Sequence, residues 1–428
     1  MVIQSARVAG YDGLPTEADS GPARATRRAC PVCGTCEAIE LAAVDLCVPD
    51  GHPLPGPLVV VSCAACAAGF SDHDVRQADF DAYYFEDAKY ADEGSTTAGE
   101  RLTPESVATP WALENKAVTA DHLLELLPLD ASLLDLGCGV GTLLVELQRR
   151  GMTRVVGLDP APRSAEVAAL LGADVRTGTF NDPPPGLGEF DAVTMIGVLE
   201  HLWDVPGALR AIRRILRPGG LLYLDAPDAA RYCHPFLVPF QDFNTEHANH
   251  FSTSALELLF ARHGFEVVWT ASVPTRADAS LPPVPAATGA FRRSDAPRTP
   301  PVAPDLSLRA ELQSFAARSA ATLARFDVYL EQALGDAQEV ALWGIGELAY
   351  KLLALPSLRR RAQLLLVDGN PARQGKRIAS MTVGHPDLLQ DSAAPVVVAA
   401  GYAAPSIMLA AGRMGLSDRL VTLPFAVR

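Results

Sequence analysis

The chain has 428 residues, a length that suits two or three domains. Its formal net charge of −14 at pH 7 disfavours nucleic acid and anionic membranes as partners. No apolar run reaches the roughly 20 residues of a membrane span, and the first ten residues lack the apolar core of a secretory signal. We therefore expect a cytoplasmic protein with neither a nucleic-acid partner nor a membrane partner.

The N-terminal part of the chain is marked by its cysteines. Residues 1–28 are rich in Gly, Ala and Ser and are expected to form a flexible tail, and six of the eight cysteines then follow before residue 67. Four of them form two C-x-x-C pairs: Cys30, Cys33, Cys63 and Cys66. Four thiolates at this spacing suit one tetrahedral zinc ion without an open coordination position, so we expect a structural zinc module over residues 29–78. Cys36 or Cys47 could replace a ligand, and a set of buried free thiols is the alternative.

A strand followed by a glycine-rich turn is expected at residues 133–141. An apolar run ends there in an aspartate and then in Gly137, Gly139 and Gly141, before a helix that begins near Thr142. The N-terminus of such a helix offers unpaired N–H groups to a nucleotide-like ligand. The third glycine comes one residue too early for the dinucleotide fingerprint G-x-G-x-x-G.

The residues around this turn suggest which nucleotide it binds. Asp135 lies directly before the turn, and a second apolar strand ends in Asp159, which can accept both hydroxyls of a ribose. This D-x-G-x-G-x-G pattern resembles motif I of class I S-adenosylmethionine (SAM) methyltransferases, and segments 179–182, 190–201 and 216–224 follow in that family's order. The resemblance implies SAM as the cofactor and S-adenosylhomocysteine (SAH) as the product; a doubly wound domain that binds another nucleotide is the alternative. The cofactor-site residues that it implies are Asp135, Gly137, Cys138, Gly139, Gly141, Asp159, Pro160, Thr179, Phe180 and Glu200.

The order of the remaining segments gives the expected domains. Strands and helices alternate through residues 79–272, which predicts a SAM-binding domain with a mainly parallel sheet. Crowded prolines mark 273–305 as a linker or a mobile loop. Residues 306–428 are expected to begin with a long helix and to continue as a second Rossmann-like unit. The predicted fold class is α/β, with a class I methyltransferase domain between a zinc module and a C-terminal Rossmann-like domain.

The three modules together resemble the sugar C-methyltransferases that act on nucleotide-linked keto-deoxysugars in antibiotic biosynthesis. The C-terminal likeness includes residues 367–376 and 384–386. In that family an acid–histidine pair follows the fifth strand, and here the pair is Glu246-His247. The resemblance implies that His247 is the base that removes a proton next to a ketone, with Glu246 orienting it, so that the enolate attacks the SAM methyl group in line. His250 is the third candidate catalytic residue.

Two departures from that family keep the acceptor atom open. Asn244 stands where the family has a tyrosine, and the aromatic residues Tyr83, Tyr84, Phe85 and Tyr90 replace a Tyr-Pro-Tyr segment. An O- or N-methyltransferase acting on a sugar or another small metabolite is therefore the alternative enzyme. A non-catalytic SAM-binding scaffold is the alternative of another class. The expected partner is a small-molecule substrate such as a nucleotide sugar, bound by a monomer or a dimer.

Overall fold

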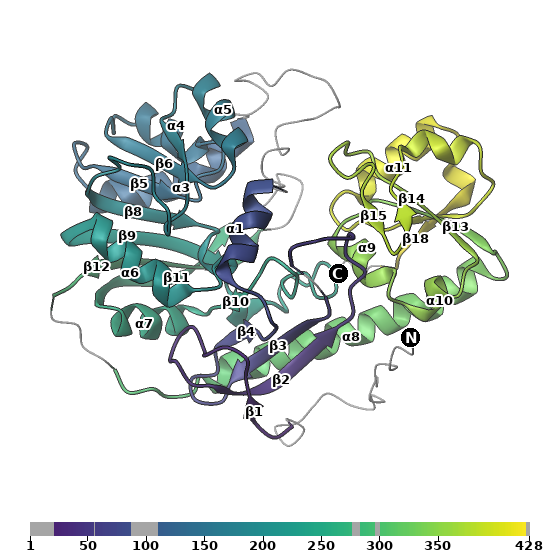
Figure 1. Ribbon diagram of the computed structural model, residues 1–428, viewed down its shortest axis with the longest axis horizontal. Coiled ribbons are helices and arrows are strands. Elements are labelled where there is room, and N and C mark those ends of the chain that lie inside the picture. The colour runs from purple at the N-terminus through teal and green to yellow at the C-terminus, as the bar shows by residue number, and fades with distance from the viewer. Residues whose placement is uncertain (1–20, 55, 87–109, 276–282, 296–299, 425–428) are drawn as a thin grey trace.

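The computed structural model describes residues 21–54, 56–86, 110–275, 283–295 and 300–424. Most of the expected tail, Tyr90 and parts of the proline-rich segment lie outside these ranges. Within the described ranges, no helix combines the length and the apolar character that a membrane crossing requires. Figure 1 shows the central domain on the left, the C-terminal domain on the right and a small antiparallel sheet below them.

The small sheet contains the cysteine pairs and one strand from much later in the chain. Its order is β1-β2-β3-β4-β10, and neighbouring strands are antiparallel. The strands are β1 (Arg24–Ala25), β2 (Glu37–Val44), β3 (Leu58–Cys63), β4 (Gly69–Ser71) and β10 (Asn249–His250). β1 lies inside the segment that was expected to be a flexible tail. It pairs with the start of β2, so these two residues belong to the sheet. The module that the cysteines define is therefore completed by residues of the central domain.

The central domain is a seven-stranded sheet of order β11-β12-β9-β8-β5-β6-β7. Its strands are β5 (Leu133–Leu136), β6 (Val155–Asp159), β7 (Val175–Thr177), β8 (Phe190–Ile196), β9 (Leu216–Pro227), β11 (Phe265–Thr275) and β12 (Val284–Arg293). Five adjacent strands of this sheet are parallel: β9, β8, β5, β6 and β7. The apolar runs of the central ones, β5 and β8, are buried, as expected for strands covered on both faces. The chain runs outward from β5 in one direction and from β8 in the other, so the crevice at a topological switch point lies at the carboxyl ends of these two strands.

Helices cover this sheet and precede it. They are α1 (Gln77–Glu86), α3 (Pro110–Leu126), α4 (Thr142–Arg149), α5 (Pro162–Leu170), α6 (Val205–Ile215) and α7 (Thr253–Arg262), with the short helices η3 (Leu199–His201) and η4 (Ala229–Arg231). Side-chain caps fix where two of them begin: Asp204 accepts from the backbone N–H of Gly207 at the start of α6, and Ser252 accepts from that of Ala255 at the start of α7.

The proline-rich segment differs from its expectation. Residues 284–293 form β12, which pairs with both β9 and β11 in the middle of an antiparallel extension of the sheet. The prolines and small residues of this stretch gave no signal for a strand. The strand is stabilised by pairing with its two neighbours rather than by its own composition. The segment expected as a linker therefore contributes a strand to the central domain.

The C-terminal domain is a four-stranded parallel sheet of order β14-β13-β17-β18. Its elements are β13 (Glu339–Trp343), α9 (Glu347–Leu352), α10 (Pro356–Arg359), β14 (Gln363–Val367), β15 (Arg377–Ile378), β16 (Met381–Thr382), η5 (Pro386–Gln390), β17 (Val396–Val398), α11 (Ala404–Arg413), η6 (Ser417–Arg419) and β18 (Leu420–Thr422). Its switch point lies between β13 and β17, and the loops after these strands point toward residues 238–245 of the central domain: a Cβ on Gly401 would lie 2.5 Å from Val238.

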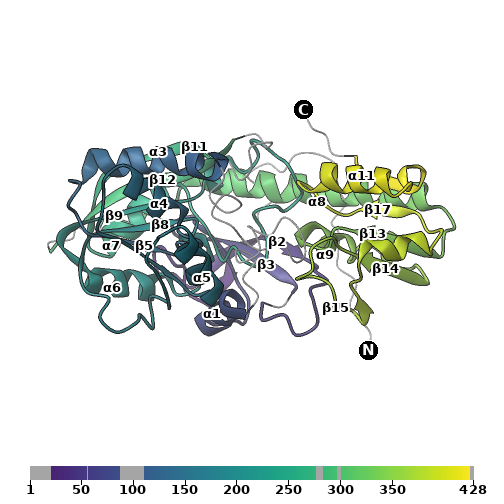
Figure 2. The same cartoon turned by 90° about the horizontal axis from the view of Figure 1, so that it is seen from above.

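One long helix, α8 (Leu306–Leu334), joins the two halves of the molecule. It runs from the small sheet to the C-terminal domain along the lower side of Figure 1, and Figure 2 shows the same span from above. Leu308, Leu312 and Phe315 near its start belong to the apolar core that the small sheet shares with the central domain. Phe326 and Leu330 near its end belong to the core of the C-terminal domain. The helix was expected from its apolar periodicity. Because its two ends are buried in different cores, the helix connects them as one continuous element.

Candidate functional site

The glycine-rich turn after β5 has one face open to a ligand. Gly137, Gly139 and Gly141 all have positive φ, at 66°, 51° and 78°, a region that favours glycine. A Cβ on Gly137 would lie 2.5 Å from a methyl carbon of Val198, and one on Gly141 would lie 3.2 Å from Val175, so these two glycines also serve close packing. A Cβ on Gly139 would meet nothing within 4 Å. The backbone at Gly139 is therefore the part of the turn that a ligand can approach.

Asp159, at the end of β6, holds this turn. Its Oδ2 accepts a hydrogen bond from the backbone N–H of Gly139 at 2.8 Å, and its Oδ1 accepts from that of Ala161 at 3.0 Å. Cys138 and Pro160 are the chain neighbours of this arrangement. Each carboxylate oxygen keeps a second lone pair, so the carboxylate can brace the turn and still accept from ribose hydroxyls.

Thr179 and Phe180 follow β7 and lie beside the same strand ends. The backbone N–H of Gly178 donates to the carbonyl of Asp159 at 3.0 Å, which joins this loop to β6. The Thr179 hydroxyl accepts from the backbone N–H of Asp182 at 3.1 Å. The structure thus brings the segment with the predicted cofactor-site residues Thr179 and Phe180 next to the predicted ribose carboxylate.

Two acids, the buried Asp135 and the half-buried Asp225, lie near the carboxyl ends of the neighbouring strands. Asp135 in β5 accepts a hydrogen bond from the Thr194 hydroxyl at 2.6 Å, and its burial raises its pKa to about 6. Asp225 in β9 accepts from the backbone N–H of Gly197 at 2.9 Å, and burial raises its pKa as well. Carboxylates in such a setting favour a cationic ligand, which would stabilise their charged forms.

Glu200 adds a third acid, in η3 directly after β8. Glu200 is 3% exposed. Burial raises the pKa of its carboxyl to about 8, with a further contribution from the charges of Asp225 and Asp242. Its Oε1 lies 3.7 Å from Nε2 of His201. Among the described residues, its Oε2 is buried without a hydrogen-bond partner. An orphaned carboxylate oxygen of this kind suits a ligand group that completes it.

Two histidines from distant segments meet beside Glu200. The rings of His201 and His247 lie 4.9 Å apart at an angle of 73°, and ligating atoms of these two residues and Glu200 all lie within 4.8 Å of one another. His201 Nδ1 lies 3.1 Å from the backbone carbonyl of Glu246 and 2.8 Å from the Tyr84 hydroxyl. Because a carbonyl only accepts, the bond to Glu246 assigns the proton to Nδ1 of His201.

The carboxylate that faces His247 is one that sequence reasoning missed. Asp242 Oδ1 lies 3.9 Å from His247 Nδ1, and burial raises the pKa of Asp242 to about 7. Glu246, which was expected to orient His247, accepts at its Oε1 a hydrogen bond from the Tyr83 hydroxyl at 2.9 Å. Asp242 stands in an irregular segment without a motif, so its position beside His247 had no signal in the sequence.

His250 lies apart from this histidine cluster. It is in β10, is fully buried, and pairs with Gly69 of β4. Its Nδ1 lies 3.1 Å from the Tyr232 hydroxyl, its ring packs 4.7 Å from that of Phe243, and burial lowers its pKa to about 3. These contacts give it a place in the apolar core as a neutral side chain, which differs from the catalytic role expected for it.

Helix α1 and the C-terminal domain reach the same site. Tyr83 and Tyr84 come from α1, which follows the small sheet. From the C-terminal domain, Glu347 accepts at Oε1 from the Thr245 hydroxyl at 3.0 Å, and its Oε2 lies 3.2 Å from the buried Nζ of Lys351. Side chains from α1 and from the C-terminal domain therefore bond to the segment that carries His247.

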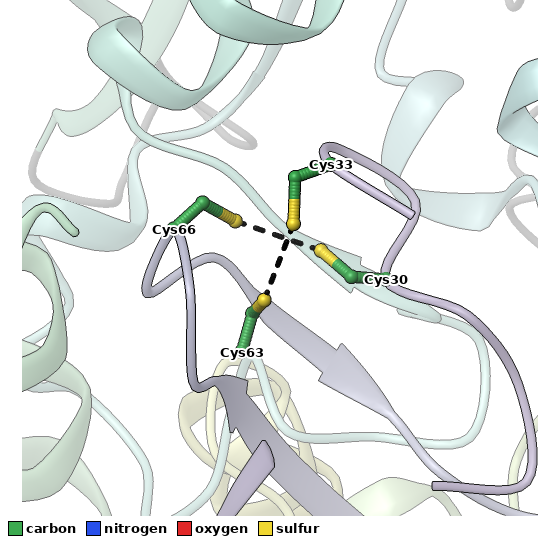
Figure 3. Close-up of side chains that lie close together, drawn as sticks. All are labelled: Cys30, Cys33, Cys63 and Cys66. Carbon is green, nitrogen blue, oxygen red and sulfur yellow. Dashed lines mark hydrogen bonds between the residues drawn. The ribbon is translucent and has the colours of Figure 1, made fainter. Parts of the chain in front are cut away.

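The four predicted zinc ligands come together in the small sheet, as Figure 3 shows. Cys30 Sγ lies 3.6 Å from Cys66 Sγ, and Cys33 Sγ lies 3.4 Å from Cys63 Sγ, with all four residues buried. Tetrahedral zinc with Zn–S bonds of about 2.3 Å holds its sulfurs about 3.8 Å apart, so the set fits the ion. Cys36 is exposed and Cys47 half-buried, and the four-cysteine cluster includes neither.

Comparison with known proteins agrees with the central part of this description. Residues 113–270 match the family model described as "Methyltransferase domain". The fold of this segment is the α/β Rossmann-like fold of class I SAM-dependent methyltransferases. The match leaves the small sheet's first four strands and the C-terminal domain outside it.

Individual relatives resemble only part of the chain. The "Ubiquinone biosynthesis O-methyltransferase" of Methylocella silvestris is 42% identical over 97 residues, which are 21% of this chain and 38% of that protein. The protein of the same name from Xanthomonas oryzae pv. oryzae is 40% identical over 101 residues, 22% of this chain and 42% of that protein. The chain thus spans about two fifths of the length of these curated relatives.

A solved structure resembles about half of this chain. Magnesium protoporphyrin IX methyltransferase from Synechocystis PCC 6803 with bound SAH is 15% identical, with a TM-score of 0.37, and the match covers 50% of this chain and 97% of that one.

Proposed function

We propose that the chain transfers the methyl group of SAM to a small-molecule acceptor, with His247 as the general base. The observation that carries this proposal is the meeting of Glu200, His201 and His247 directly after β8, at the switch point of a methyltransferase domain. That crevice also holds the open face of Gly139, so a cofactor bound along the turn ends beside the histidines.

The residues present fit SAM. Gly139 leaves room for a ligand against the backbone, and Asp159 has lone pairs for the ribose. Glu200 has a buried oxygen without a hydrogen-bond partner in the part of the chain that the structure describes. Asp135, which is buried, and Asp225, which is half-buried, add negative charge near a ligand that carries a sulfonium and an ammonium. When bound, SAM supplies an electrophilic methyl group.

On the protein side, His247 accepts the proton of the acceptor at one ring nitrogen. The electron pair of the broken C–H or O–H bond stays on the acceptor atom, which would then be the nucleophile for the methyl group that bound SAM would supply. Asp242, 3.9 Å away, stabilises the positive form of His247 once the proton has arrived. Tyr84 and the carbonyl of Glu246 fix the ring of His201, which packs edge-on against His247 and limits its rotation.

Within this reaction we propose C-methylation of a nucleotide-linked keto-deoxysugar. The support comes from Tyr83 and Glu347, which bond to the segment that carries His247. Both residues lie outside the segment that matches the methyltransferase family model. Parts of the chain that the methyltransferase family model does not cover thus contribute to acceptor choice. O-methylation of a small metabolite is the second candidate, favoured by the names of those relatives.

We also propose that the four-cysteine site holds one structural zinc ion. Four buried sulfurs at tetrahedral spacing leave no position for a substrate or a water, so the ion's contribution is to the fold.

Incubation of a nucleotide-linked keto-sugar with the protein in deuterated water distinguishes the candidates. C-methylation predicts deuterium exchange at the carbon next to the ketone, lost in His247→Ala and kept in His385→Ala, a matched change of an exposed histidine. SAH release with hydroxyl-bearing acceptors, without exchange on the keto-sugar, would replace carbon by oxygen as the acceptor atom. No SAH release with sugars, alcohols or amines would leave a SAM-binding scaffold.

A further inference from the structure

Arg28 links three segments that are far apart in the chain. Its Nε donates to the carbonyl of Ser71 at 3.0 Å, and its Nη1 donates to the carbonyl of Trp203 at 3.0 Å. Its Nη2 donates to the carbonyl of Ala248 at 2.5 Å and to Oδ1 of Asn249 at 2.9 Å. The three segments are β4, the turn after η3, and the residues that directly follow His247.

The surroundings of this guanidinium are those of a fixed group. It lies over the ring of Trp203, 3.9 Å from the ring centroid, and 5.2 Å from that of Phe70. These four hydrogen bonds all go to neutral oxygens, so the planar fork of an arginine is used here for geometry rather than for pairing with a carboxylate.

Asn249 extends the link to the other histidine. It is fully buried, and while its Oδ1 accepts from Arg28, its Nδ2 donates to the carbonyl of Leu202 at 2.7 Å and to that of Leu199 at 3.2 Å. These carbonyls flank the turn that carries Glu200 and His201. The position of one amide side chain thus sets the turn with His201 against the segment with His247.

The small sheet holds the His247 segment from its other side. The backbone N–H of Ser71 donates to the carbonyl of Ala248 at 2.9 Å, and the Ser71 hydroxyl donates to the carbonyl of His247 at 3.2 Å. β10 then continues the sheet from Asn249 onward. Two residues after Arg28, Cys30 begins the four-cysteine site, so the same short segment belongs to both arrangements.

We propose that Arg28 is a positioning residue for His247: it fixes the histidine's segment to the small sheet and to the turn that carries His201. The proposal rests on the proposed function only in giving His247 the role of base. The contacts through which Arg28 acts are its hydrogen bonds to the carbonyl of Ala248 and to Oδ1 of Asn249.

The experiment compares Arg28→Met with Arg24→Met in the full chain. Arg24 is an arginine of the same sheet whose side-chain bonds go to Glu40, Asp72 and the carbonyl of Ala25, all inside the small module. The readouts are the rate at which diethyl pyrocarbonate modifies His247, mapped by mass spectrometry between about pH 6 and 8, and the affinity for SAH by calorimetry. Neither readout needs methyl transfer, so failure of the proposed function leaves the test intact.

In Arg28→Met the modification rate of His247 is expected to rise about fivefold, the effect of one net hydrogen bond on a local opening equilibrium. The affinity for SAH is expected to stay within about twofold, because the turn at Gly139 shares no partner with Arg28. Arg28→Lys is expected to give an intermediate rate, since an ammonium cannot serve all the acceptors of the fork. Arg24→Met is expected to change neither readout.

The proposal is overturned if folded Arg28→Met modifies His247 at the parent rate, if Arg24→Met raises the rate as much, or if SAH binding weakens by the same factor. If Arg28→Met does not fold, Ser71→Ala decides, because it removes only the hydroxyl that donates to the carbonyl of His247. A rise in His247 modification in Ser71→Ala supports the proposal, and an unchanged rate overturns it.

Discussion

The hydroxyl of Thr245 donates to the carboxylate of Glu347 at 3.0 Å, although the two residues are 102 positions apart. Thr245 lies two residues before His247, and Glu347 begins α9 of the C-terminal domain. The loop after β17 approaches the same part of the central domain at Val238. The C-terminal domain therefore lies against the segment that carries the proposed base.

This contact predicts the effect of filling the space between the domains. In Gly401→Val the new Cβ would start 2.5 Å from a methyl carbon of Val238, so the two segments must separate. Overpacking of this size costs about 1–3 kcal/mol, which we expect as a rise of roughly tenfold in the KM for the acceptor, with SAH affinity unchanged. Steady-state kinetics and calorimetry measure the two quantities. Gly369→Val is the control, because a Cβ there meets nothing within 4 Å; equal effects of the two variants would contradict the prediction.

The buried acids predict that SAM binds more tightly at higher pH. Burial raises the pKa of Asp135 to about 6 and that of Glu200 to about 8, while Lys116 opposes the shift of Asp135. Below its pKa each group is neutral, and a cationic ligand favours the ionised form, so binding releases protons and affinity rises with pH. Between about pH 5.5 and 8.5 we expect roughly a tenfold gain for SAM and a smaller one for SAH, which lacks the sulfonium charge.

Calorimetry in two buffers of different ionisation enthalpy measures the proton release directly. Glu200→Gln is expected to lose the part of the gain that lies near pH 8, since its side chain cannot ionise. A SAM affinity that is flat or falls with rising pH would show that these carboxyls do not face the cofactor.

Asp159 is expected to contribute to cofactor binding in two ways. Asp159→Asn replaces a charged acceptor of two backbone N–H groups, those of Gly139 and Ala161, and weakens the ribose contact. Hydrogen bonds to a charged group are worth about 1.5–3 kcal/mol, so SAH affinity should fall by about 10- to 100-fold. Asp182→Asn, an exposed change in the neighbouring loop, should leave it unaltered. Similar losses in both variants would remove Asp159 from the cofactor site.

His247 and His250 should respond to substitution in opposite ways. His247→Ala should lower kcat by about 10²- to 10⁴-fold, the usual contribution of a general base, with little change in thermal stability because the side chain is part-exposed. His250→Ala opens a cavity in the core and loses the bond to Tyr232, so it should lower the melting temperature while the folded fraction keeps its kcat. Kinetics and thermal denaturation together check the pair, and a folded, stable but inactive His250→Ala would return His250 to the list of catalytic candidates.

The zinc proposal predicts one metal ion per chain by elemental analysis. Cys63→Ser should lose the ion and lower the melting temperature by about 5 °C or more, because metal binding is coupled to the folding of such modules. Cys36→Ser, a change of an exposed cysteine outside the cluster, should retain both. A zinc-free parent protein with an intact small sheet would contradict the proposal.

Local patterns predicted the parts of the fold that local patterns determine. β5, the glycine turn and α4 follow one another in sequence, so the apolar run and the three glycines were enough to place them. The helical periodicity predicted α8 in the same way. The two C-x-x-C pairs predicted the cysteine cluster because zinc imposes a recognisable spacing on its ligands.

Other parts depend on partners that are remote in the chain. β12 is a strand because β9 and β11 flank it, and its prolines and small residues carry no such signal. Arg28 was expected in a flexible tail, although its four acceptors lie in residues 71, 203, 248 and 249. Asp242 lies opposite His247 through the course of an irregular loop, for which the sequence offers no periodicity.

The pairing of β10 with β4 has a consequence for how the chain reaches this structure. Residues up to Ser71 leave the ribosome long before Asn249 and His250 exist, so β4 waits as an open edge of the small sheet during synthesis. A fragment ending before β10 keeps that edge bare, which favours pairing with another copy of itself. The matched methyltransferase segment, residues 113–270, would in turn carry β10 without the strand that it pairs with. Expression of either piece alone separates β4 from β10, and only the joined chain completes the small sheet.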